Sequence, residues 1–101
     1  MQTDEKNTLE ELKRDFDSYM KGEEAALLEL ERAPTLENWR TIIVRTGIGE
    51  APDAMVLTGT VTGHPQHLAG TRILTSQLIW LDRNRRWART WNRVYRLAPR
   101  Q

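Results

Sequence analysis

The chain has 101 residues, enough for one hydrophobic core and too few for two independent ones. Hydrophobic residues make up 39% and charged residues 29%, so we expect a thin core under a large solvated surface. Cysteine is absent, which excludes disulfides, thiolate metal sites and cysteine nucleophiles and favours a reducing, cytoplasmic location. The sequence shows neither a signal peptide nor an apolar run long enough to span a membrane.

The charge is divided unevenly along the chain, although the net charge is only +1. Residues 1–35 carry ten acidic and five basic side chains, whereas residues 36–101 carry four acidic side chains and ten arginines. Two interpretations follow from this pattern. The basic part binds a polyanion, or the acidic helical part simply docks on it.

The N-terminal third predicts helices. Residues 1–7 are expected to be disordered, and Thr8 with Glu11 fits a capping box at the start of a helical segment over residues 8–33. Apolar residues recur every three or four positions, and Gly22 interrupts them, which predicts a bent helix or a helical hairpin. Pro34 ends the segment.

From Trp39 onward the apolar period changes to two, which predicts strands. The expected strands are residues 39–46, 55–63, 72–81 and 86–98, with loops at 47–53 and 63–70 and a hairpin turn at 82–85. We expect Trp39, Leu57 and Leu78 in the core. The threonines are expected on the exposed face because of their β propensity; they are Thr58, Thr60, Thr62 and Thr75.

This order of elements predicts a single α+β domain over residues 1–101. Helices followed by strands with short connections are typical of α+β folds, and short connections favour antiparallel pairing. We therefore predict an N-terminal helical segment packed on a four-stranded antiparallel sheet formed by residues 39–98.

Several short motifs occur in one order along two-thirds of the chain. They include Gly63-His64-Pro65, Thr75-Ser76, Leu81-Asp82, Ala88-Arg89-Thr90 and Tyr95-Arg96-Leu97. With these motifs the chain resembles a family of small uncharacterised bacterial proteins, a domain of unknown function with some members linked to mobile elements. The resemblance implies a compact domain of bacterial or phage origin, and it implies no activity.

The residues that could carry chemistry do not form a complete set. His64 and His67 lack the third and fourth ligands that zinc requires, so no metal is expected. A hydrolytic triad needs the residue types of Ser76, His64 and Asp82. However, Ser76 lies within a predicted strand rather than on a nucleophile elbow. We predict neither an enzyme nor a cofactor.

The last predicted strand is the most informative segment. Aromatic residues and arginines alternate along it, and further arginines crowd the preceding turn, which is typical of protein interfaces and of surfaces that stack on bases. The candidate partner-binding residues are Arg83, Arg85, Arg86, Trp87, Arg89, Trp91 and Arg93. The structural alternative is that the aromatic rings are buried under the helices while the arginines pair with helix acids.

The sequence therefore predicts a non-enzymatic accessory protein that binds a protein or nucleoprotein partner. One concrete form is a phage-type inhibitor that masks a surface of host machinery. The alternative is a nucleic-acid-binding regulator that uses the C-terminal strand rich in arginine and tryptophan. A homodimer is left open, and no membrane association is expected.

Overall fold

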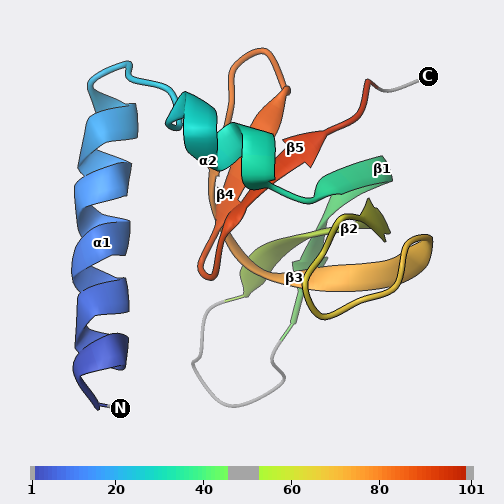
Figure 1. Ribbon diagram of the computed structural model, residues 1–101, viewed down its shortest axis with the longest axis horizontal. Helices are drawn as coiled ribbons and strands as arrows, with labels where there is room; N and C mark the ends of the chain where they lie inside the picture. The colour runs from blue at the N-terminus through green and yellow to red at the C-terminus, as the bar shows by residue number, and fades with distance from the viewer. Residues whose placement is uncertain (1, 46–52, 100–101) are drawn as a thin grey trace.

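The protein is a small closed β-barrel preceded by two helices (Figure 1). The computed structural model describes residues 2–45 and 53–99, except for the side chains of residues 2–8. The elements are α1 (Gln2–Met20), α2 (Leu27–Arg32), β1 (Thr35–Val44), β2 (Ala54–Thr62), β3 (Thr71–Leu81), β4 (Trp87–Thr90) and β5 (Val94–Leu97). The prediction of an α+β fold with a four-stranded sheet is therefore wrong.

The helical part has two helices, one of the two forms expected from Gly22. Helix α1 begins at Gln2, ahead of the predicted start at Thr8. Gly22 has a φ of 95°, a backbone conformation that residues other than glycine rarely adopt. The turn at Gly22 ends α1. Helix α2 ends at Arg32, directly before Ala33 and Pro34, as predicted. Among the described residues, neither helix is long and apolar enough to cross a membrane.

The barrel closes because the first and last strands pair in parallel. Thr35 lies opposite Arg96, and Leu36 lies opposite Leu97. The Arg96 N–H donates to the Pro34 carbonyl at 2.8 Å, and the Ala98 N–H donates to the Leu36 carbonyl at 2.9 Å. Short connections exclude parallel pairing between consecutive strands, but here the whole antiparallel meander connects the two paired strands.

A tight turn divides the predicted fourth strand into β4 and β5. The Thr90 N–H and hydroxyl both donate to the Arg93 carbonyl, at 2.8 and 3.1 Å. The Trp91 N–H donates to Gln77 and the Asn92 N–H donates to Ser76, so β3 supports the turn. The turn contains neither glycine nor proline, and a single asparagine, Asn92, is only a weak local signal for it.

A bulge in β1 explains an essential glycine in β2. The pairing of β1 with β2 shifts register between Glu37 and Arg40, and Asn38 adopts a φ of 51°. A Cβ atom on Gly59 would lie 2.9 Å from the Glu37 carbonyl oxygen and 3.2 Å from the Trp39 Cα. The two backbones can approach this closely only without a side chain at position 59. Most of the predicted loop over residues 47–53 lies outside the described residues.

The barrel interior is one apolar cluster. It contains Leu36, Trp39, Leu57, Val61, Ile73, Ala88, Tyr95 and Leu97, with Leu78 partly buried against it. Two predicted surface threonines are buried instead. Pairing of β2 with β3 is interrupted between Val56 and Thr58. There Thr75 accepts the Leu57 N–H, and Thr58 donates to the Ile73 carbonyl, each at 3.0 Å.

Candidate functional site

The three arginines of the predicted hairpin turn are exposed. Asp82 organises the turn, because its backbone carbonyl accepts the Arg85 N–H and its carboxylate accepts the Arg86 N–H at 3.1 Å. Arg83, Arg85 and Arg86 point into solvent, and no acidic side chain of the described residues lies within ion-pair distance of them. This part of the candidate site is an exposed cationic surface, although Arg83 also lines a pocket together with Glu23, Glu24 and Asp82.

Arg89 is buried, and it joins the helices to the barrel. Its guanidinium contacts the Asp15 carboxylate of α1 at 2.8 Å and the Glu29 carboxylate of α2 at 3.9 Å. Its Nε also donates to the Thr90 carbonyl at 3.0 Å. The pairing of a sheet arginine with helix acids, predicted as the structural alternative, is confirmed for this residue.

Trp87 is also buried, in a second apolar cluster between the helices and the barrel. This cluster contains Tyr19, Ala25, Ala33, Trp87 and Val94, with Leu30 and Trp80 packed against it. The centroids of the Tyr19 and Trp87 rings are 4.9 Å apart. Burial and the nearby Asp15 carboxylate raise the pKa of Tyr19 to about 12, although Arg89 opposes this shift.

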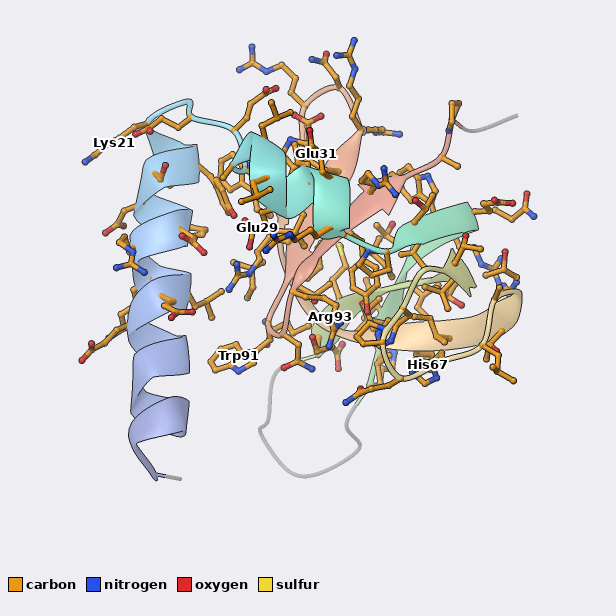
Figure 2. All side chains as sticks on the ribbon, in the orientation of Figure 1. Lys21, Glu29, Glu31, His67, Trp91 and Arg93 are labelled. Atoms are coloured by element: carbon orange, nitrogen blue, oxygen red, sulfur yellow. The ribbon has the colours of Figure 1, made fainter. Side chains whose placement is uncertain are left out.

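Trp91 faces α1 and lines an apolar groove of about 490 Å³ (Figure 2). The groove lies between α1 and β3, and its lining residues are Leu9, Leu12, Lys13, Phe16, Asp17, Gln77, Leu78, Ile79 and Trp91. Phe16 and Trp91 remain 37% and 41% exposed. The predicted strand placed Trp91 beside Trp87, but the turn separates them, so one of these indoles is buried and the other is accessible.

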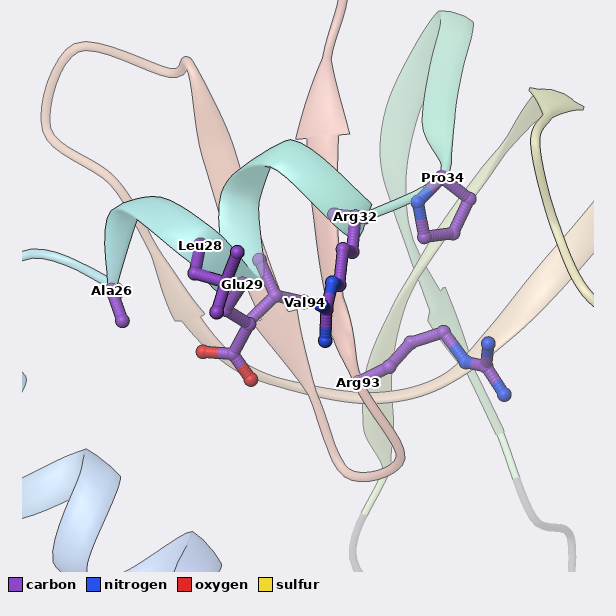
Figure 3. A pocket seen from close by; sticks show the side chains of 8 residues that line it. Ala26, Leu28, Glu29, Arg32, Pro34, Arg93 and Val94 are labelled. Carbon is purple, nitrogen blue, oxygen red and sulfur yellow. The ribbon is translucent and has the colours of Figure 1, made fainter.

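Arg93 lines a different pocket of about 470 Å³ beneath α2 (Figure 3). Apolar residues form most of this pocket, together with the charged side chains Glu29, Arg32 and Arg93. The Glu29 carboxylate and the Arg93 guanidinium point to opposite sides in Figure 3. Burial raises the pKa of Glu29 even though Arg89 lies nearby. The two guanidinium groups and the one carboxylate give the lining a formal charge of +1.

The histidine pair lies beside Arg93 rather than in a cluster of metal ligands. The rings of His64 and His67 are 4.5 Å apart, and the Nδ1 atom of His64 accepts the Gln66 N–H at 3.0 Å. Burial, Arg93 and His67 each lower the pKa of His64. Within the described parts of the chain, no three side chains of histidine, aspartate or glutamate are grouped to hold a metal.

The other residues considered for hydrolysis have structural roles. The Ser76 hydroxyl accepts the Asn92 N–H at 3.2 Å and so supports the turn between β4 and β5. The Asp82 carboxylate accepts a backbone N–H in the hairpin turn. The groove at Phe16 and Trp91 was missed from sequence, because it requires a helix residue and a turn residue from opposite ends of the chain to meet.

Fold and site together define a small closed β-barrel with two N-terminal helices that pack on it through a buried arginine. The chain belongs to the family of unknown function DUF6634, whose profile matches residues 10–100. The resemblance to an uncharacterised domain family is thereby confirmed. No curated protein and no solved structure matches the chain.

Proposed function

We propose that this protein is a cytoplasmic accessory protein that binds a protein partner without catalysing a reaction. The observation that carries the proposal is the groove between α1 and β3, where two large aromatic side chains stay accessible. A masking inhibitor of host machinery, of bacterial or phage origin, is one concrete form of this function.

The composition of the groove supports a protein partner. Tryptophan is enriched among the residues that dominate binding energy at protein interfaces, and aromatic rings bury a large apolar area for few rotatable bonds. Leu12 and Leu78 add apolar lining beside the exposed Phe16 and Trp91. Lys13 and Asp17 also line the groove, so charged groups accompany its apolar residues, as in the polar rim of an interface.

The experiment is an affinity purification from the native host with nuclease-treated lysate. Wild type is compared with Trp91→Ala and with the matched control Leu68→Ala, since Leu68 is 84% exposed and lies outside the groove. We expect the same protein to copurify with wild type and Leu68→Ala and to be lost with Trp91→Ala, with all three equally folded. The proposal is wrong if the same protein still copurifies with Trp91→Ala, or if nuclease treatment of the lysate removes it from wild type.

The same variants test self-association. If a second copy of the chain occupies the groove, sedimentation will show a wild-type dimer that Trp91→Ala converts to a monomer. In that case the partner is the protein itself, and the proposal of a heterologous partner is wrong.

The second candidate function is nucleic-acid binding through the exposed arginines of the hairpin turn. Its supporting observation is that Arg83, Arg85 and Arg86 have no acidic partner among the described residues. If all three bind phosphates of duplex DNA, the triple alanine variant should flatten the log–log salt dependence of binding by about 0.9 for each phosphate that is no longer neutralised. Micromolar binding near physiological salt that the triple variant abolishes would favour this function over the first.

A further inference from the structure

A third pocket is lined by residues of the connection between α1 and α2 and of the turn between β3 and β4. Figure 1 shows these two connections at the same end of the molecule. The volume of the pocket is about 350 Å³. The lining residues are Tyr19, Met20, Gly22, Glu23, Glu24, Trp80, Asp82, Arg83, Asn84 and Trp87. None of them lines the groove at Trp91, so the two sites are distinct.

The charge of this pocket is opposite to that of the surrounding barrel surface. Three carboxylates and one guanidinium line it, which gives the lining a formal charge of −2. Asp82 is only 7% exposed, and among the described residues no basic side chain lies within ion-pair distance of its carboxylate. A buried carboxylate in such a setting favours a cationic ligand.

Aromatic rings form another part of the lining. The Tyr19 ring centroid lies 5.9 Å from that of Trp80 and 4.9 Å from that of Trp87. The face of an indole attracts ammonium and guanidinium groups, and a neighbouring carboxylate adds to this attraction. A metal ion fits less well, because the described residues provide no group of three metal-ligating side chains.

One of the lining residues, Trp87, carries an unused hydrogen-bond donor. The Nε1 atom of Trp87 is buried, and it has no hydrogen-bond partner among the described residues. Buried indole N–H groups normally find an acceptor. A ligand that combines a positive charge with a carbonyl oxygen would satisfy both the carboxylates and this N–H group.

We propose that this pocket binds a lysine or arginine side chain presented by a peptide. The cationic group lies against Trp80, in a pocket whose negative charge comes from the carboxylates of Glu23, Glu24 and Asp82. A backbone carbonyl of the same peptide accepts the Trp87 Nε1–H. This site does not depend on the groove at Trp91 and retains its ligand when that groove is altered.

The test is a titration of the ¹⁵N-labelled 101-residue chain, observed by NMR. The probes are the N-acetyl methylamides of lysine, trimethyllysine and arginine, and the neutral control is the N-acetyl methylamide of norleucine. We expect a saturable shift of the Trp87 indole N–H with at least one cationic probe and none with norleucine. The indole N–H of Trp39 is the internal reference, since it already donates to the Ala98 carbonyl at 2.8 Å.

Variants localise the binding. The double variant with Glu23→Gln and Glu24→Gln should weaken binding of the cationic probe roughly tenfold, the equivalent of about 1.4 kcal/mol in binding free energy. Glu31→Gln, an exposed acidic residue of α2 outside the pocket, should leave binding unchanged, as should Trp91→Ala. Equal binding of norleucine, no saturable shift of Trp87 with any cation, or full binding by the double variant would overturn the proposal.

Discussion

The barrel interior and the helix–barrel interface are both buried, but they are built differently. The interior is a continuous apolar cluster whose buried polar groups, such as Thr58 and Thr75, have hydrogen-bond partners. The helix–barrel interface is the second cluster together with the ion pairs of Arg89. It contains a buried cation, two carboxylates and the indole N–H of Trp87, which has no hydrogen-bond partner in the described part of the chain.

This difference distinguishes the part of the molecule that stabilises the fold from the part that carries the candidate sites. A largely apolar, well-packed interior whose polar groups are hydrogen-bonded contributes most to the free energy of folding and offers nothing to a ligand. The helix–barrel interface is interrupted by charged groups, and the groove at Trp91, the pocket beneath α2 and the acidic pocket all border the helical part. We therefore expect the barrel to be the stable scaffold and the helices to create the binding surfaces.

The largest effect is expected inside the barrel. Leu57 is fully buried at the centre of the interior cluster, so Leu57→Ala should lower the free energy of unfolding by about 2–5 kcal/mol. Chemical denaturation measures this change. Leu74→Ala on β3 is the control, because Leu74 is 61% exposed and its truncation should change stability by less than about 0.5 kcal/mol. Similar losses in both variants would mean that Leu57 does not carry the core.

At the helix–barrel interface, Arg89→Met should lower the free energy of unfolding by about 1.5–3 kcal/mol, the usual range for a hydrogen bond to a charged group. The substitution leaves Asp15 without its cation, but Asp15 is partly exposed and regains water. The effect should be local: hydrogen exchange should speed up in α1 while the barrel strands stay protected.

A double-mutant cycle separates the ion pair from the packing of Arg89. Asp15→Asn should cost much less in the Arg89→Met background than in wild type. Asp17→Asn on the same helix is the matched control and should be additive with Arg89→Met. In the hydrogen-exchange experiment on Arg89→Met, equal loss of protection in α1 and in the barrel strands would show that the two regions do not differ in stability.

The next largest loss of stability is expected where the backbones of β1 and β2 lie close together at the bulge. Gly59→Ala places a Cβ atom 2.9 Å from the Glu37 carbonyl oxygen, so the bulge must shift, at a cost of about 1–3 kcal/mol. Thermal unfolding measures the loss. Gly70→Ala is not a control for packing. A Cβ atom at Gly70 would meet no atom within 4 Å, but the residue has a φ of 85°, which strains any other side chain. Wild-type stability of Gly59→Ala would contradict the tight β1–β2 contact.

The smallest effect concerns alkaline pH. The folded pKa of Tyr19, about 12, lies above its ordinary value of 10.0, because burial and Asp15 favour the neutral phenol. The resulting stabilisation is complete below pH 10 and is lost as the pH rises through 12. Tyr19→Phe should remove this part of the pH dependence. Near-ultraviolet absorbance follows the ionisation, and the raised pKa of Tyr95 remains as a background.

The sequence alone determined the features that depend on neighbours in the chain. Gly22 and Pro34 bounded the helices, the period of two marked the strands, and the hairpin turn after Leu81 was predicted correctly. The core positions of Trp39 and Leu57 also followed from the local pattern. Such features are readable because backbone propensity and apolar periodicity act over a few residues.

Tertiary structure decided the closure of the barrel and the residues that line each pocket. The turn at Trp91 is held by hydrogen bonds to Gln77 and Ser76 of another strand, and strand closure joins Thr35 to Arg96. Because that turn reverses the chain, alternation along one strand could not show which arginines and tryptophans are exposed. Burial is a property of contacts between distant segments, and a local pattern constrains such contacts only after the topology is known.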